Sequence, residues 1–140
     1  MMLLSKADVF GVEDLKREVV PVPEWGGDVL VRGATAEEAD AYQDSLSRTK
    51  MDEDGKTRIE EHYENAKARF IVNCIINEDG TRMFTPAEVE KLGKKSAVAI
   101  NRIYQVAARL SGTTKRARQE LEGNSGAGQA ENSSSTLPAT

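Results

Sequence analysis

Two valine-rich runs on either side of a Gly-Gly pair constrain the fold of this 140-residue chain more than any other feature. The runs occupy residues 18–23 and 29–32, and Gly26 and Gly27 lie between them. Glycine adopts the positive φ angles that tight hairpin turns require, so the pattern predicts a β-ribbon over about residues 17–32.

The prolines and valines of this ribbon indicate how it should be placed. Pro21 and Pro23 have no N–H to donate to a neighbouring strand, so the first strand should lie at an edge. Val20 and Val22 share one face, because side chains alternate along a strand. A two-stranded ribbon is marginally stable alone in water, so we expect this apolar face to pack on other elements.

Four helices are predicted after the ribbon. Two capping-box patterns, Thr35 with Glu38 and Thr85 with Glu88, mark helix starts. The strongest helical period in the chain lies between residues 59 and 75, where apolar residues recur at steps of three and four. The helices are expected at about residues 35–47, 58–76, 86–93 and 96–111.

These elements predict a mainly helical α+β fold, in which the N-terminal hairpin packs on about four short helices. Ser96 and Gly112 bound the last of the helices as N-cap and stop signal. The length fits one domain, which we place at residues 1–115. Residues 116–140 should form a flexible tail, because they are rich in Gly, Ser and Asn and hold little apolar material.

Composition excludes several classes of function. Aromatic residues make up only 5% of the chain, which argues against a surface that stacks on bases. No apolar run approaches the length of a membrane span, and the first residues lack the pattern of a signal peptide. The single Cys74 allows no internal disulfide and fits a reducing compartment. A soluble cytosolic domain is therefore expected.

No catalytic, cofactor or metal site is predicted. The turn at residues 52–55 resembles a calcium loop, but Lys50 occupies its first ligand position. His62 is expected on a wet helical face among acids, without a nucleophile or substrate to serve. Cys74 lies on an apolar stripe and is interpreted as a small buried hydrophobe.

Charge is unevenly distributed, although the formal net charge is only −4. Residues 1–90 carry 11 bases and 20 acids, whereas residues 91–118 carry eight bases and no acid. Such an asymmetry bears on the partners of a protein. The basic segment is typical of a solvated helix face, of a surface that docks an acidic protein, or of a nucleic-acid footprint.

The candidate protein-binding residues come from this segment and from the hairpin turn. On a helix, residues seven apart lie on one face, which would align the basic residues from 95 onwards. The only tryptophan is expected either to cover the apolar face of the ribbon or to anchor a partner. The candidates are Trp25, Lys94, Lys95, Arg102 and Arg109.

The order and spacing of several turns, caps and helix ends resemble the tail assembly chaperones of long-tailed bacteriophages and prophages. The resemblance covers roughly residues 3–115. The segments that carry it are Val22-Pro23-Glu24-Trp25-Gly26-Gly27-Asp28-Val29-Leu30-Val31-Arg32, Thr35-Ala36-Glu37-Glu38, Ile75-Ile76-Asn77-Glu78-Asp79-Gly80-Thr81-Arg82-Met83-Phe84-Thr85, and Ala107-Ala108-Arg109-Leu110-Ser111-Gly112.

The resemblance implies a non-enzymatic role in viral morphogenesis. Such chaperones bind the tape measure protein in the host cytoplasm and keep it soluble until the tail tube polymerises around it. They are absent from the mature virion. A ribosomal frameshift often yields a longer form that is thought to recruit the tail tube protein, and this chain would be the short, unshifted form.

Two alternative functions stay open from the sequence. The chain could be a structural tail or head–tail completion protein that stays in the virion. It could be a small nucleic-acid-binding regulator that uses residues of the basic segment, although nucleic acid is the less favoured partner. The opposite charges of the N-terminal and basic regions would also allow copies of the chain to associate with one another.

Overall fold

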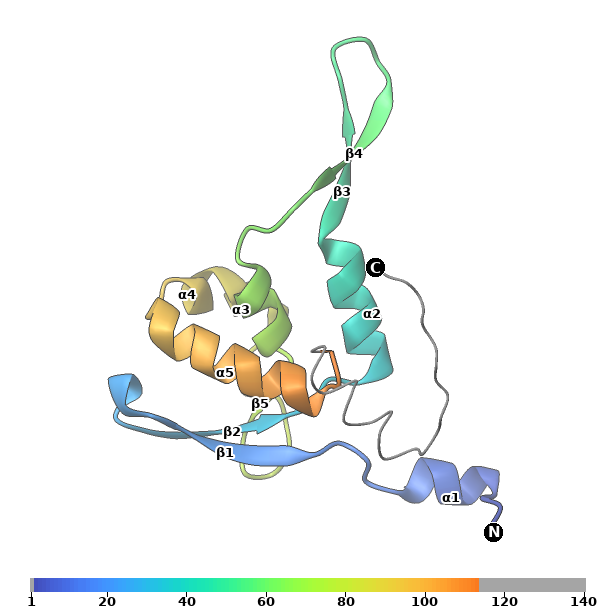
Figure 1. Cartoon of the computed structure of the whole chain (residues 1–140), viewed down its shortest axis with the longest axis vertical. Coiled ribbons are helices and arrows are strands. Elements are labelled where there is room, and N and C mark those ends of the chain that lie inside the picture. The colour runs from blue at the N-terminus through green and yellow to red at the C-terminus, as the bar shows by residue number, and fades with distance from the viewer. Residues whose placement is uncertain (1, 114–140) are drawn as a thin grey trace, which may run out of the picture.

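A computed structural model describes residues 2–113 of the chain (Figure 1). A three-stranded antiparallel sheet has the order β1-β2-β5, and a separate two-stranded hairpin is formed by β3 and β4. The helices α3 and α5 pack on each other, and α5 also contacts β1 and β2. The predicted tail at 116–140 lies outside the described residues. The α+β fold class is confirmed.

The N-terminal ribbon forms as its sequence predicts. β1 (Arg17–Val22) pairs antiparallel with β2 (Gly27–Arg32), and β1 is an edge strand. Val20 and Val22 are both buried on the face that meets the helices. The connection is a short 3₁₀ turn, η1 (Pro23–Trp25), which ends at Gly26 with a φ of 80°. Glycine adopts this left-handed conformation without a steric penalty.

The predicted helix at 58–76 is wrong. The segment instead holds β4 (Thr57–Glu61), the short helix α3 (Ala66–Ile71) and β5 (Ile75–Ile76). β4 pairs with β3 (Ser47–Met51), so the expected polar loop at 48–57 is largely strand. Ile59 and Tyr63 are 76% and 59% exposed, so they do not belong to a buried helical stripe.

Local interactions explain why this hairpin forms. Arg48 lies opposite Glu60, and its Nε donates to the Glu60 carboxylate at 2.8 Å. Oppositely charged cross-strand pairs stabilise an antiparallel ribbon. The Asp52 carboxylate accepts hydrogen bonds from the Asp54 and Lys56 amides at 3.1 and 2.9 Å, which closes the turn. The motif that resembles a calcium loop is thus the tip of the β3–β4 hairpin.

The remaining helices lie within or beside their predicted ranges, with one addition. The capping box predicted at Thr35 and Glu38 is present, and Ser96 accepts from the Ala99 amide at 3.3 Å. A helix near the N-terminus was not predicted. The helical elements outside the 58–76 segment are α1 (Lys6–Gly11), α2 (Ala36–Ser45), η2 (Pro86–Glu88), α4 (Val89–Gly93) and α5 (Ala97–Leu110).

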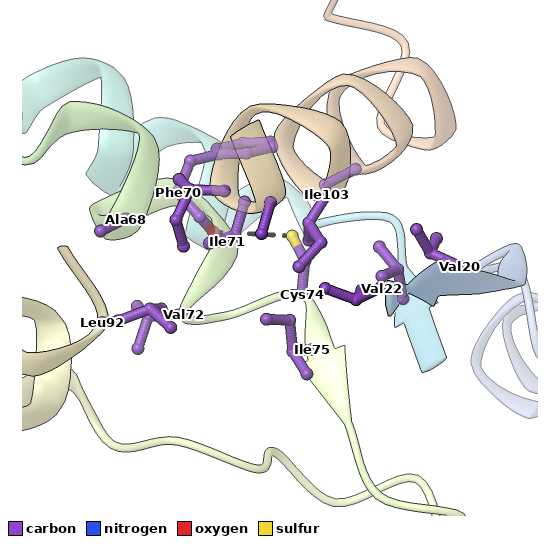
Figure 2. Close-up of a cluster of buried hydrophobic side chains, with 14 of the residues drawn as sticks. Val20, Val22, Ala68, Phe70, Ile71, Val72, Cys74, Ile75, Leu92 and Ile103 are labelled. Carbon is purple, nitrogen blue, oxygen red and sulfur yellow. Dashed lines mark hydrogen bonds between the residues drawn. The ribbon is translucent and has the colours of Figure 1, made fainter. Parts of the chain in front are cut away.

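The hydrophobic core fills the space between the sheet and the helices (Figure 2). Its fully buried side chains include Ile75 from β5, Ile103 from α5 and Val22 from β1. Cys74 is also fully buried, and its Sγ lies 3.6 Å from the Phe70 carbonyl oxygen as a donor. Burial raises the pKa of the Cys74 thiol to about 12, so it stays neutral and packs as a small hydrophobe, as predicted.

A buried ion pair joins the end of β2 to the first turn of α2. Arg32 Nη1 and Nη2 donate to the two carboxylate oxygens of Glu38 at 2.8 and 3.0 Å. The same carboxylate accepts the Thr35 amide at 3.0 Å and lies 3.2 Å from Arg82 Nη2. Burial alone would raise the pKa of Glu38, but the hydrogen bonds from Arg32 and Thr35 and the nearby positive charges outweigh it and lower the pKa.

Next to this pair, the chain passes directly against the end of α5. A Cβ on Gly33 would lie 2.8 Å from the Leu110 carbonyl oxygen, which is a backbone atom and has little freedom to move. The Ala34 amide donates to Ser111 Oγ at 2.8 Å. Residues 32–38 therefore connect the sheet, α2 and the end of α5, and we call them the junction.

Breaking the buried pair from one side should be much worse than removing both partners. Arg32→Met or Glu38→Leu alone leaves a buried charge without its partner and should cost about 3–5 kcal/mol of unfolding free energy. The double variant should lose less than the sum of the two single losses, as measured by urea denaturation. Arg48→Ala, which opens an exposed pair, is the control and should cost no more than about 1 kcal/mol. Additive single losses would contradict this account.

Gly33→Ala should destabilise the junction by about 1–3 kcal/mol, because the added methyl group forces the end of α5 away from β2. Gly27→Ala is the matched control, since a Cβ at that position meets nothing within 4 Å. Thermal unfolding of both variants checks the prediction. Equal melting temperatures would show that α5 is free to shift at this point.

Candidate protein-binding surface

The structure brings together only part of the predicted binding set. Trp25 ends the turn η1, and Lys95 lies between α4 and α5. Both line one surface cavity of about 270 Å³, together with Phe84, Glu88, Lys91 and Leu92. We call this cavity the tryptophan groove. Lys94 is exposed beside Lys95 but does not line the groove.

Arg102 and Arg109 lie on the side of α5 that faces the β1–β2 hairpin. Arg102 donates to both carboxylate oxygens of Glu24 at 2.6 and 2.9 Å. Arg109 Nη2 donates to Glu18 at 2.7 Å. The hydrogen bonds from Arg102 lower the pKa of Glu24 to about 2. Arg102 and Arg109 share one side of α5, whereas Lys95, the third residue of the predicted alignment, lies before the helix. Both arginines pair with acids of the same chain, and their role toward a partner stays a prediction.

The tryptophan groove combines an apolar interior with a basic rim. The buried side chain of Leu92 from α4 lines the groove, together with the half-buried rings of Trp25 and Phe84. Lys91 and Lys95 are exposed at the rim. Neither lysine forms an ion pair with any carboxylate of residues 2–113. Such a groove can take up an apolar side chain and place an acidic neighbour beside it.

Glu88, the one acidic side chain of residues 2–113 that lines the groove, already accepts a hydrogen bond within the chain. The Glu88 carboxylate accepts the Thr85 amide at 2.8 Å, which fixes the start of the turn η2. This hydrogen bond also holds the loop that carries Phe84. The lysines of the rim are therefore the charges of the groove that lack such a partner among the described residues.

A comparison with protein families settles the relationship of the chain to known proteins. The family model described as phage tail assembly chaperone matches residues 9–124, which is most of the sequence. The chain belongs to the phage tail assembly chaperone family. The match covers both hairpins, all the described helices from α2 to α5 and the tryptophan groove.

A solved structure supports the same fold. The structure of the bacteriophage HK97 tail assembly chaperone superimposes with a TM-score of 0.52 at 17% sequence identity. The alignment covers 74% of this chain and 88% of that one. At this identity the similarity establishes the arrangement of the elements and nothing finer. No curated protein sequence matches the chain.

Two other apolar surfaces of this chaperone-family chain are unburied. The helix α1 buries none of its residues, and its Phe10 is 82% exposed. The β3–β4 hairpin extends away from the core (Figure 1) and exposes Met51 and Ile59. The helix α1 was not predicted, although Ser5 and Asp8 form a capping box, which is a sequence signal for a helix start.

The residues considered for other chemistry do not assemble into a site. His62 lies after β4, and its amide donates to the Leu46 carbonyl at 2.7 Å. Within residues 2–113, no three His, Cys, Asp or Glu side chains lie close enough together to hold a metal ion. In the same range, no helix has the length and hydropathy that crossing a membrane requires.

The contact between Glu24 and Arg102 should make the hairpin turn sensitive to acid. The pKa of Glu24 is depressed from 4.5 to about 2, so its stabilising contribution is present above about pH 4.5 and is lost as the pH falls toward 2. Glu24→Gln should lower the melting temperature at pH 6, and the difference from the unmodified chain should shrink below pH 4.5. Glu78→Gln is the control, because Glu78 forms no ion pair among the described residues.

Thermal unfolding between pH 2.5 and 7, followed by the emission of Trp25, measures this difference. Trp25 is next to Glu24 and is the only tryptophan, so its emission reports the hairpin turn directly. A pH-independent difference between Glu24→Gln and the unmodified chain would show that the carboxylate charge does not stabilise the turn.

Proposed function

We propose that this chain binds the tape measure protein of its phage in the host cytoplasm and keeps it soluble while the tail tube assembles. The observation that carries this proposal is the family match over residues 9–124. A tape measure protein is a long helical chain, and its apolar stripes would aggregate if they were left bare. A protein that holds such stripes needs apolar docking surfaces and enough charge to stay in solution.

The surface of the chain supports such a holding role. The tryptophan groove offers an apolar interior, and α1 and the β3–β4 hairpin expose further apolar side chains. Charged residues make up 30% of the sequence and favour solubility. Non-enzymatic binding, without a cofactor, is sufficient for this role. We also propose that the chain is the short form, that a longer frameshifted form recruits the tail tube protein, and that neither stays in the virion.

One observation disfavours the nucleic-acid alternative. A protein that binds nucleic acid uses lysines and arginines to neutralise phosphates. Here Arg102 and Arg109, two of the basic residues of that alternative, already pair with Glu24 and Glu18. An acidic protein partner would find the exposed lysines of the groove rim, whereas a duplex would need an extended basic face.

Co-expression of the tape measure protein with and without this chain tests the proposal. We expect the tape measure protein to be mostly insoluble alone, and to become soluble and co-purify when the chain is present. An unrelated acidic domain of similar size is the control. Equal solubility in all three cases would contradict the holding role.

Mass spectrometry of purified phage particles separates a chaperone from a structural component. We expect to find the chain in infected cells and not in mature particles, because the tail tube covers the tape measure protein at the end of assembly and leaves the chain no surface to bind. Recovery of the chain as a stoichiometric component of the particles would favour the alternative of a structural tail or head–tail completion protein.

A further inference from the structure

The size of the tryptophan groove points to a side chain as its occupant. Its volume of about 270 Å³ is at the small end of the roughly 300–1,000 Å³ that small-molecule sites occupy and is ample for one large side chain. Leu92, Trp25 and Phe84 supply an apolar interior from three separate segments of the chain. Apolar pockets of this kind, with a tryptophan in the wall, are typical anchor sites for one large side chain of a partner.

The charge at the rim selects which partner fits. Lys91 and Lys95 have no acidic partner among residues 2–113, whereas Arg102 and Arg109 of the neighbouring helix do. Glu88, the acid of the lining, is held by the Thr85 amide. A partner with carboxylates beside its apolar anchor would therefore complete the ion pairs that the chain itself leaves open.

The backbone next to the groove favours a helix over a strand as the partner. Strand addition requires a sheet edge with free N–H groups. The end of the edge strand β1 nearest the groove carries Pro21, and the turn η1 that leads to Trp25 begins with Pro23, so neither residue has an N–H to offer. A helix brings its own backbone hydrogen bonds and needs only a pocket for its apolar residues.

From these three observations we infer that the tryptophan groove receives a helical segment of the tape measure protein. In that segment a large apolar side chain is flanked by Asp or Glu within one helical turn, so that it fills the groove while the acids contact Lys91 and Lys95. This inference rests on the proposed function, and it adds the surface and the chemistry of the bound segment.

Two synthetic tryptophan-free peptides of 18 residues test the inference on the full chain. Both carry the same leucine stripe, but one has Glu and the other Lys beside it. Because Trp25 is the only tryptophan, its emission reports occupation of the groove. We expect the Glu peptide to shift this emission and to bind about tenfold more tightly than the Lys peptide, since each rim ion pair changes affinity a few-fold.

Charge reversal at the rim should invert this preference. In Lys91→Glu/Lys95→Glu the Lys peptide should become the tighter binder. Lys16→Glu/Lys56→Glu makes the same change in net charge at exposed lysines away from the groove and should keep the original preference. Circular dichroism checks that both variants are folded, and we expect them to be, because all four lysines are exposed.

Three results would overturn the inference. These are equal affinity for the two peptides, an unchanged preference in Lys91→Glu/Lys95→Glu, and a Trp25 shift that depends on protein concentration without peptide, which would place a second copy of the chain in the groove. Capture of the tape measure protein separates this inference from the proposed function. If the unmodified chain and Lys91→Glu/Lys95→Glu capture it equally, only the inference fails; if the unmodified chain captures none, the proposed function fails.

Discussion

The buried pair between Arg32 and Glu38 determines how the parts of this molecule are joined. Its two hydrogen bonds link the last residue of β2 to the first turn of α2, and Arg82 extends the contact to the loop after β5. A buried carboxylate is tolerated only when its lone pairs are occupied, and here Arg32, Thr35 and Arg82 occupy them. The helix α2 therefore starts at one point and in one direction, and α3 packs on it through the ring of Phe70, 4.9 Å from that of Tyr42.

A second set of ion pairs joins α5 to β1 and to the turn η1: Arg109 with Glu18 lies near the junction, and Arg102 with Glu24 lies at the turn. Arg102 with Glu24 and Arg109 with Glu18 lie at the surface, where water and salt weaken them. They join α5 to the β1–β2 hairpin, and Glu24 of the Arg102 pair is next to Trp25, which lines the tryptophan groove. The tryptophan groove thus lies beside an exposed ion pair, whereas the junction is held by a buried one.

The sequence predicted those elements whose signals are local. The valines, prolines and glycines of the ribbon specify β1 and β2, and Ser96 with Gly112 specifies α5, because turn and cap chemistry acts over a few residues. The segment 58–76 failed because Ile59 and Tyr63 repeat at a helical spacing while they lie exposed on an extended arm. Trp25 and Lys95 were found as binding candidates by residue type. Phe84, Lys91 and Leu92 were not, because only the tertiary fold brings them to Trp25.

The charge asymmetry of the sequence is partly neutralised inside the molecule, because two of the eight bases of residues 91–118, Arg102 and Arg109, pair with Glu24 and Glu18. Among residues 2–113, the bases of this segment that form no ion pair with the chain's own acids are Lys91, Lys94 and Lys95. A groove of about 270 Å³ with two exposed lysines offers few contacts and hence a weak individual site. On a long client with many similar segments, several chains bound in this way would add their weak contacts. Under the proposed function, each such contact would be displaced singly as the tail tube advances, which a single tight interface would not allow.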